Sequence, residues 1–383
     1  MRLHSIYEVP DLIYLFVGGG VICFFIGASV SKMITSRTNR GNQTKYVPDY
    51  FSLKVYKVFF LIALFLSITY SLGAIKILLS GGTLNDIYHL HMGNGINDDS
   101  NQLQHSFLDQ VLSVYIMTPI QYFLTPLSIC LYLRKGDKKY LYYGFLLALF
   151  RVVYHGGRAA LVFAILYFVV LYFVVPKTKE NAKLFRQVKR TLLVVGGLSV
   201  TLFVSMTVGR DAEMGQNTYL YVAGAIPNLS ERFVQLLTYN HTYGLLCFRG
   251  LIYPFLSFKR AITGSSSAQE TIDEIFNDTQ IGVDIGADVE YNAFVTCFYY
   301  FYADGGLIGV VLGSILFGFI SQYIYEKMKS NGTLLWYSIY AIFFVNVIVY
   351  SFNAFMLSYI QVSWALVYAI LFFKLSKNKR QLL

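Results

Sequence analysis

Long apolar segments alternate with polar ones along this chain, and the alternation predicts membrane-spanning helices. A helix needs about 20 consecutive apolar residues to cross the hydrocarbon core of a bilayer. We expect nine such spans, at Leu12–Val30, Val55–Leu79, Val111–Leu133, Leu141–Tyr154, Ala159–Val175, Leu192–Val208, Gly306–Tyr325, Leu334–Tyr350 and Ala354–Phe373. The predicted fold class is an all-α polytopic integral membrane protein with about nine to eleven transmembrane helices.

The composition supports the same class. Of the 383 residues, 56% are hydrophobic and only 14% are charged, and the mean hydropathy is +0.52. Such a chain is too apolar for a water-soluble globule of this size. No internal repeat relates two halves, so we expect a single membrane domain over residues 1–383, and a transporter built from repeats is disfavoured.

Basic residues gather in alternate polar segments, and this pattern assigns the two sides of the membrane. Cytoplasmic loops retain Lys and Arg. Five segments are basic, whereas residues 80–110 contain four aspartates and no Lys or Arg. We therefore expect a protein of the cytoplasmic membrane with its N-terminus outside and its C-terminus in the cytoplasm. The first apolar run continues into basic residues without a small-residue cleavage site, so we expect it to be retained as a span. The net charge of +10 follows from this topology, and we expect no nucleic-acid partner, which would need one clustered basic face.

One polar segment, residues 209–305, is much longer than the others. It contains five basic and eleven acidic residues. We expect it to form a large extracytoplasmic loop that is partly helical, with a short surface helix at Ala268–Asn277. Tyr243–Phe258 is apolar enough to enter the bilayer but carries Arg249 and Pro254, so we expect it to be re-entrant or interfacial.

Glycines mark two further features. Gly156 and Gly157 are expected to break the helix after the fourth span. Small residues spaced along the seventh span predict that another helix packs closely against it, and these are Gly305, Gly309, Gly313 and Gly318.

Three arginines next to apolar segments are candidate anion ligands. Arg158 opens the fifth span shortly after Arg151, Arg210 follows the sixth span, and Arg249 has apolar neighbours. An arginine at membrane depth is costly, so it usually lines a polar cavity. Because guanidinium groups bind phosphates bidentately, we predict that Arg158, Arg210 and Arg249 bind a lipid-linked phosphate or pyrophosphate. The alternatives are that Arg158 extends to the outer surface and that Arg210 pairs with a neighbouring acid.

Candidate groups for proton transfer lie in the same loop. His241 is the only histidine of this loop, and histidine is the residue type best suited to proton transfer near neutral pH. Glu290 is the second candidate catalytic residue and Asp304 a further alternative, although each acid also fits a solvated or capping role. Nine tyrosines of this region can pack against sugar rings or form the aromatic belt of a membrane interface.

The sequence lacks the spacings that hold metals or nucleotides. There is no Asp-x-Asp, no Cys-x-x-Cys and no His/Asp cluster, and the only Gly triplet, Gly18–Gly20, lies within the first span. We expect no metal ion and no cofactor. The four cysteines are expected to be packed thiols, with a Cys247–Cys297 disulfide as the alternative.

Four features together resemble the Wzy-type polysaccharide polymerases, which are the oligosaccharide repeat unit polymerases of O-antigen and capsule synthesis. They are the large outer loop, Gly156-Gly157-Arg158 opening a span, Gly209-Arg210-Asp211 leaving one, and Asn292-Ala293-Phe294 leading through an aromatic run to Asp304-Gly305. The resemblance implies a membrane glycosyltransferase that joins undecaprenyl-pyrophosphate-linked repeat units on the outer leaflet, with outer-loop arginines holding the pyrophosphate. A flippase and a chain-length regulator are then the expected partner proteins, beside the lipid bilayer itself. The Arg-x10-Gly pattern of some members is absent at Arg158, Arg210, Arg232 and Arg249.

Three other functions stay open on the sequence. An O-antigen-ligase-type enzyme would move the finished glycan to another acceptor. A flippase for lipid-linked oligosaccharide would show paired broken helices and charges near the midplane of both halves. A structural or sensory membrane protein would carry the three arginines incidentally.

Overall fold

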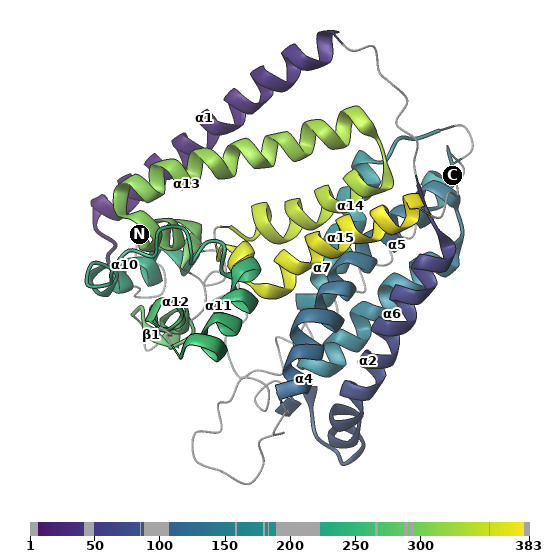
Figure 1. Cartoon of the computed structure of the whole chain (residues 1–383), viewed down its shortest axis with the longest axis horizontal. Coiled ribbons are helices and arrows are strands. Elements are labelled where there is room, and N and C mark those ends of the chain that lie inside the picture. Colours follow the sequence, from purple (N-terminus) through teal and green to yellow (C-terminus); the bar gives the residue numbers. More distant parts are fainter. Residues whose placement is uncertain are drawn as a thin grey trace. The chain divides into compact units, whose positions relative to one another are not determined.

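The structure, a computed structural model, is that of an all-α polytopic membrane protein (Figure 1). It describes residues 7–41, 50–84, 86–87, 107–157, 159–178, 181–182, 184–188, 223–264, 267–286, 290–291, 295–351 and 353–378. These residues form two compact units. Unit 1 takes the described part of Met1–Lys45, Val204–Ser330 and Asn346–Ser363, and unit 2 that of Tyr46–Phe203, Asn331–Val345 and Trp364–Leu383.

Helices make up nearly all of the regular structure. The elements before the acidic loop are α1 (Asp11–Gly41), α2 (Leu53–Leu79), α4 (Phe107–Val111), the π-helix η2 (Leu112–Met117), α5 (Thr118–Lys135), α6 (Lys138–His155) and α7 (Ala159–Val174). Those that follow are α10 (Ala225–Leu236), α11 (Arg249–Thr263), α12 (Ser267–Asp278), β1 (Val283–Asp284), β2 (Glu290–Tyr291), α13 (Thr296–Asn331), α14 (Leu334–Ile342), η3 (Phe343–Val349), η4 (Met356–Ser358) and α15 (Ile360–Asn378). The two short strands pair antiparallel.

Five helices of the described residues are long and apolar enough to cross a membrane. They are Asp11–Ser36, Leu53–Leu79, Leu112–Lys135, Thr296–Asn331 and Ile360–Lys377. Three other expected spans are also helical. They are two shorter apolar helices, Ala159–Val174 and Leu334–Val349, and the more basic α6. The expected span Leu192–Val208 lies outside the described residues. The fold class is therefore confirmed. The last span begins later than expected, at Ile360 instead of Ala354, because residues 354–359 form a bend and a 3₁₀ turn before the helix.

Unit 2 is built around α5. This helix is buried from Thr118 to Leu133 and packs against α2, α6, α7 and α14. Polar contacts join it to α2, where Gln121 Nε2 donates to Ser67 Oγ at 2.7 Å. The expected break after α6 is confirmed, because Gly156 ends that helix in a left-handed conformation with φ +65°.

Unit 1 contains the close helix pair that the glycine spacing predicted. The helices α1 and α13 lie side by side (Figure 1), and a Cβ atom on Gly318 would be only 1.9 Å from the carbonyl oxygen of Phe24. On the other helix, a Cβ on Gly27 would be 1.9 Å from the carbonyl oxygen of Ile315. Only glycine permits the two backbones to come this close.

The helix α13 is broken within its length. Gly305 and Gly306 have non-helical backbone angles, so α13 consists of a first part, residues 296–304, and a second part, residues 307–331. A Cβ on Gly309 would lie 2.2 Å from the carbonyl oxygen of Phe301, which shows that the first part folds back against the second. This break positions the candidate site.

Candidate functional site

The turn at residues 241–248, between α10 and α11, is attached to the break in α13. The Thr242 N–H donates to the carbonyl of Ala303 at 3.1 Å, and the Tyr243 N–H donates to that of Asp304 at 2.8 Å. Both carbonyls belong to the last turn of the first part of α13, where carbonyl groups have no partner within their own helix. The turn therefore caps this helix end and is held rigidly against it.

The side chain of Asp304 completes this attachment. Its carboxylate is buried and accepts hydrogen bonds from the N–H groups of Leu246 and Cys247, both at 3.0 Å, and from the Thr242 hydroxyl. Burial, with a further contribution from the charge of Asp304, raises the pKa of the Cys247 thiol. Asp304 is thus a buried acceptor that orders the turn, and not the solvated acid considered for it.

His241 stands at the start of this turn and is exposed. Its imidazole lies against Gly306, where a Cβ atom would be 3.3 Å from the ring. The Tyr302 ring meets the imidazole edge-on, with 6.4 Å between the ring centroids. Gly306 has φ +60°, so glycine is favoured there both by the backbone conformation and by the close approach of His241.

The second part of α13 begins beside this imidazole. The first N–H groups of a helix lack intrahelical acceptors and form the positive end of its dipole. Residues 307–331 provide such an end directly after Gly306. The exposed imidazole and the N-terminal end of this second part are therefore adjacent.

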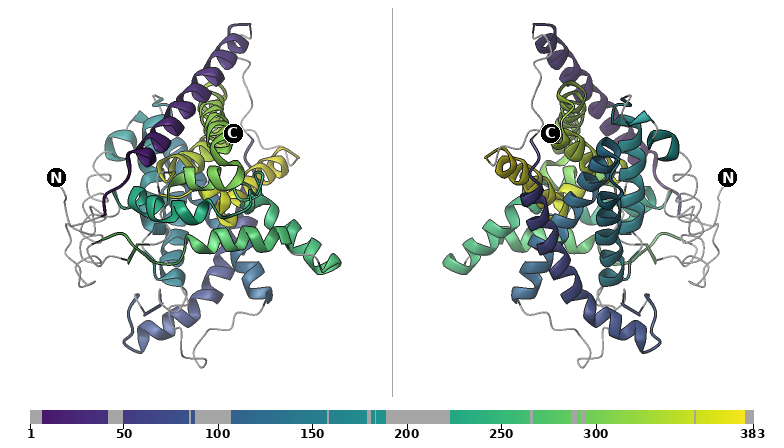
Figure 2. Two further views of the ribbon diagram at one scale, coloured as in Figure 1. Left: turned by 90° about the vertical axis from the view of Figure 1, so that its left-hand side faces the viewer. Right: turned by 90° about the vertical axis from the view of Figure 1, so that its right-hand side faces the viewer.

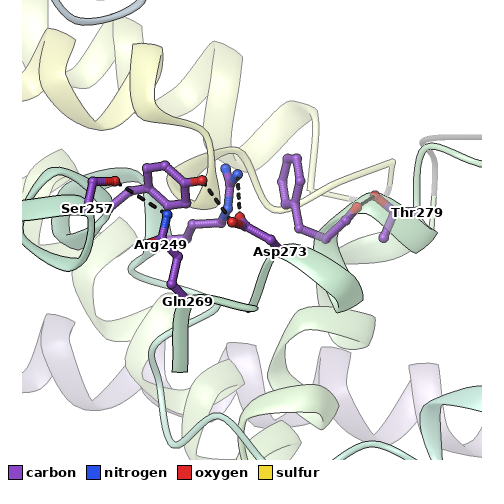
Figure 3. Close-up of polar contacts among 7 residues, drawn as sticks. Arg249, Ser257, Gln269, Asp273 and Thr279 are labelled. Atoms are coloured by element: carbon purple, nitrogen blue, oxygen red, sulfur yellow. Dashed lines mark hydrogen bonds and ion pairs between the residues drawn. The ribbon is translucent and has the colours of Figure 1, made fainter. Parts of the chain in front are cut away.

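Arg249, eight residues after His241 and the first residue of α11, is already paired with an acid. Its Nη2 atom is 3.3 Å from Asp273 Oδ1 in α12, and the two side chains are 12% and 25% exposed. The guanidinium carbon lies 4.5 Å from the ring centroid of Tyr253 and 3.9 Å from that of Phe276. The Arg249 Nε atom is buried without a hydrogen-bond partner. The anion that a buried guanidinium requires is thus supplied by the chain itself (Figure 3).

Other polar contacts continue this cluster along the two helices. The Tyr253 hydroxyl donates to Asp273 Oδ2 at 2.8 Å, and Gln269 Nε2 donates to Ser257 Oγ at 3.4 Å (Figure 3). Burial raises the pKa of Tyr253, which keeps its hydroxyl protonated as the donor to Asp273. Sequence reasoning missed Asp273, because it lies 24 residues from Arg249 and no local motif links them.

Arg232 in α10 is the most completely enclosed arginine that the described segments contain. It is 3% exposed, its Nε donates to Asn228 Oδ1 at 2.8 Å, and its Nη atoms donate to the carbonyls of Asp278 and Ile281. These bonds fix α10 to the end of α12. The N–H groups of the Arg232 guanidinium are thus used in hydrogen bonds within the fold.

The other predicted site residues are Arg158, Arg210 and Glu290. Arg158 and Arg210 lie outside the described residues. Glu290 is in β2, where it pairs with Asp284, and its side chain is outside the described part. In unit 2, Arg151 donates to the Tyr122 hydroxyl, and its guanidinium lies 3.6 Å from that ring centroid.

Two of the tyrosines considered for sugar packing belong to the core of unit 1. Tyr299 and Tyr300 are 1% and 0% exposed, so they do not present a sugar-binding surface. All four cysteines are free, so the Cys247–Cys297 disulfide is absent from this structure. Cys130, Cys247 and Cys297 are buried as packed thiols, whereas Cys23 is only partly buried. The residues that the structure describes contain no group of three His, Cys, Asp or Glu side chains suited to a metal ion.

Comparisons with protein-family models, with curated proteins and with solved structures find no match to this chain. The geometry of the turn and the sequence features given above are therefore the observations that bear on its function.

Proposed function

We propose that this chain is a polysaccharide polymerase of the cytoplasmic membrane. It joins undecaprenyl-pyrophosphate-linked oligosaccharide repeat units on the outer face by glycosyl transfer that needs no metal ion. In this proposal the N-terminus is outside, the C-terminus is in the cytoplasm, and residues 209–305 face the outer side.

One observation supports this function most directly. The exposed imidazole of His241 is fixed against Gly306, directly before the second part of α13 begins. Glycosyl transfer from a pyrophosphate donor needs a group that takes a proton and a pole that stabilises negative charge. His241 supplies the first, and the positive end of this helix supplies part of the second.

The proposed reaction forms one bond and breaks another. A hydroxyl oxygen of the acceptor sugar attacks the anomeric carbon of the donor, and the bond from that carbon to the pyrophosphate oxygen breaks. The electron pair of that bond leaves with the undecaprenyl pyrophosphate. His241 takes the hydroxyl proton, and Glu290 is the alternative base.

The arginines divide between two roles in this proposal. Arg158 and Arg210 bind the departing pyrophosphate, as the sequence argument expects. Arg249, already paired with Asp273, acts mainly by holding α11 and α12 in place and so shaping the site.

Purified full-length protein in nanodiscs, supplied with an undecaprenyl-pyrophosphate-linked repeat unit, tests this function. The released undecaprenyl pyrophosphate and the length distribution of the glycan are measured together, with and without EDTA. We expect a ladder of products that EDTA does not change. His241→Gln should lower the rate about 100-fold or more, which is typical for loss of a general base. The exposed neighbour Asn240 offers the matched control, Asn240→Ala, with a normal rate.

The competing functions give different results in the same assay. A ligase forms a single bond to a separate acceptor and makes no ladder, and a flippase moves the lipid-linked glycan without releasing its carrier. Either result, or a full-rate His241→Gln variant together with a full-rate Glu290→Gln variant, contradicts the proposal.

A further inference from the structure

The helix α11 carries a stripe of large apolar side chains that the rest of the chain leaves uncovered. They are between 37% and 69% exposed, and they are Phe248, Leu251, Phe255, Phe258 and Ile262. The first residue directly precedes the helix, and the steps along the stripe are three, four, three and four residues. This spacing places all five on one face.

The opposite face of α11 is packed, so the stripe cannot turn inward. Arg249 and Tyr253 contact Asp273, and Ser257 accepts a hydrogen bond from Gln269. At Gly250, a Cβ atom would lie 2.5 Å from the carbonyl oxygen of Leu357. In Figure 2 the green pair of α11 and α12 extends to one side of α13. The outward direction of the stripe is therefore built into the fold of unit 1.

One basic residue of α11 borders this stripe. Lys259 and Arg260 are exposed near the C-terminal end of the helix, and α11 has no acidic residue. The acidic residues of the helix pair all belong to α12. By helical spacing Arg260 lies on the same face as Arg249, whereas Lys259 borders the apolar stripe, where a long basic side chain can extend toward phosphate groups.

We propose that α11 lies flat in the outer interface of the bilayer and binds anionic phospholipids. The stripe enters the boundary between headgroups and acyl chains, and Lys259 contacts the lipid phosphates. The chain spans a membrane, so a lipid surface is available to this helix, and a lipid surface matches both the apolar stripe and the adjacent Lys259. A second copy of the chain would match the stripe but would leave Lys259 without an acidic partner on this helix. This inference does not depend on the proposed enzymatic activity.

Fluorescent labels on the full-length protein in nanodiscs test the position of α11. Phe255→Cys and Phe258→Cys place a label on the stripe, and Thr263→Cys, which is exposed at the end of the helix, is the matched control. A Cys23→Ala background removes the one native cysteine that is not buried. We expect labels at 255 and 258 to be quenched by lipids with a nitroxide high on the acyl chain and to be protected from aqueous iodide. The label at 263 should show the reverse. Iodide quenching of both stripe labels contradicts the proposal, and protection of both from either quencher indicates a protein partner and also contradicts it.

The composition of the nanodisc tests the role of Lys259. Raising phosphatidylglycerol from none to about a third of the lipid should deepen the label at 258 in the native sequence. Lys259→Gln should lose this response, because a cation near an anionic surface favours binding by about fivefold, whereas Arg260→Gln, on the opposite face, is the matched control and should keep it. An equal response of the native sequence and Lys259→Gln overturns the assignment of Lys259 to anionic lipid.

Discussion

Replacing Asp273 by asparagine tests whether Arg249 holds the fold together or waits for an external anion. The substitution keeps the size of the side chain and removes its charge. In the structure this carboxylate lies 3.3 Å from Arg249 Nη2 and 2.8 Å from the Tyr253 hydroxyl. Breaking a fully buried ion pair costs about 3–5 kcal/mol, whereas an exposed pair contributes about 0–1 kcal/mol. Exposures of 12% and 25% place this pair between the two limits, so we expect a loss of about 2 kcal/mol.

Hydrogen exchange followed by mass spectrometry measures this loss where it occurs. If α11 opens locally, 2 kcal/mol corresponds to amide exchange about 30-fold faster in its peptides. The matched control is Glu274→Gln, which removes an exposed acid one residue further along α12 and should change exchange by less than about twofold. A double-mutant cycle with Arg249→Met isolates the pair, and we expect a coupling energy of about 1–2 kcal/mol. If the α11 amides of Asp273→Asn exchange no faster than those of Glu274→Gln, or if the coupling energy is near zero, the Arg249–Asp273 pair does not hold α11 in place.

Three further predictions concern the close helix pair, the break in α13 and the buried thiol. Gly27→Ala should destabilise the protein by about 2 kcal/mol or more, because its Cβ would meet a backbone carbonyl at 1.9 Å. Gly19→Ala, whose Cβ would have no neighbour within 4 Å, should be neutral or stabilising in the same unfolding assay. Gly306→Ala should lower the free energy of unfolding by about 1–3 kcal/mol and reduce the rate of glycosyl transfer, because Gly306 has a positive φ. Gly305→Ala, at an extended φ of −163°, should retain more stability and more activity, and equal effects of the two variants would contradict this reason. Cys247 should resist maleimide at pH 8 until detergent unfolds the protein, because burial raises its thiol pKa; rapid modification of the native state would show that the turn opens.

Features set by short sequence distances were predictable. The expected surface helix Ala268–Asn277 is α12, and the glycine pair at 156–157 ends α6 as expected. The close helix partner predicted from the glycine spacing is α1 at Gly318, but Gly309 and Gly313 face Phe301 in the first part of α13 and Gly305 meets no neighbour. These succeeded because helix periodicity, capping and glycine conformation are local properties.

The candidate site was only partly predictable, because its partners are distant along the chain. His241 was a candidate proton acceptor from the sequence, yet its contact with Gly306 joins positions 65 residues apart. Tyr243–Phe258 was expected to be one re-entrant or interfacial segment, but it divides into a turn around Asp304 and the start of α11. Burial of the Asp304 carboxylate requires donors, and the turn provides them from its own backbone.

The sequence by itself determined that this is an all-α membrane protein, because the length and hydropathy of its segments are fixed by the thickness of the bilayer. It also determined which arginines and which histidine deserve study. Only the tertiary structure decided that Arg249 is paired with Asp273 and that Asp304 orders a turn, since the partner of a buried charge is chosen by packing and not by nearby sequence. The same packing left one face of α11 open and apolar, and this face is the one we assign to the membrane surface.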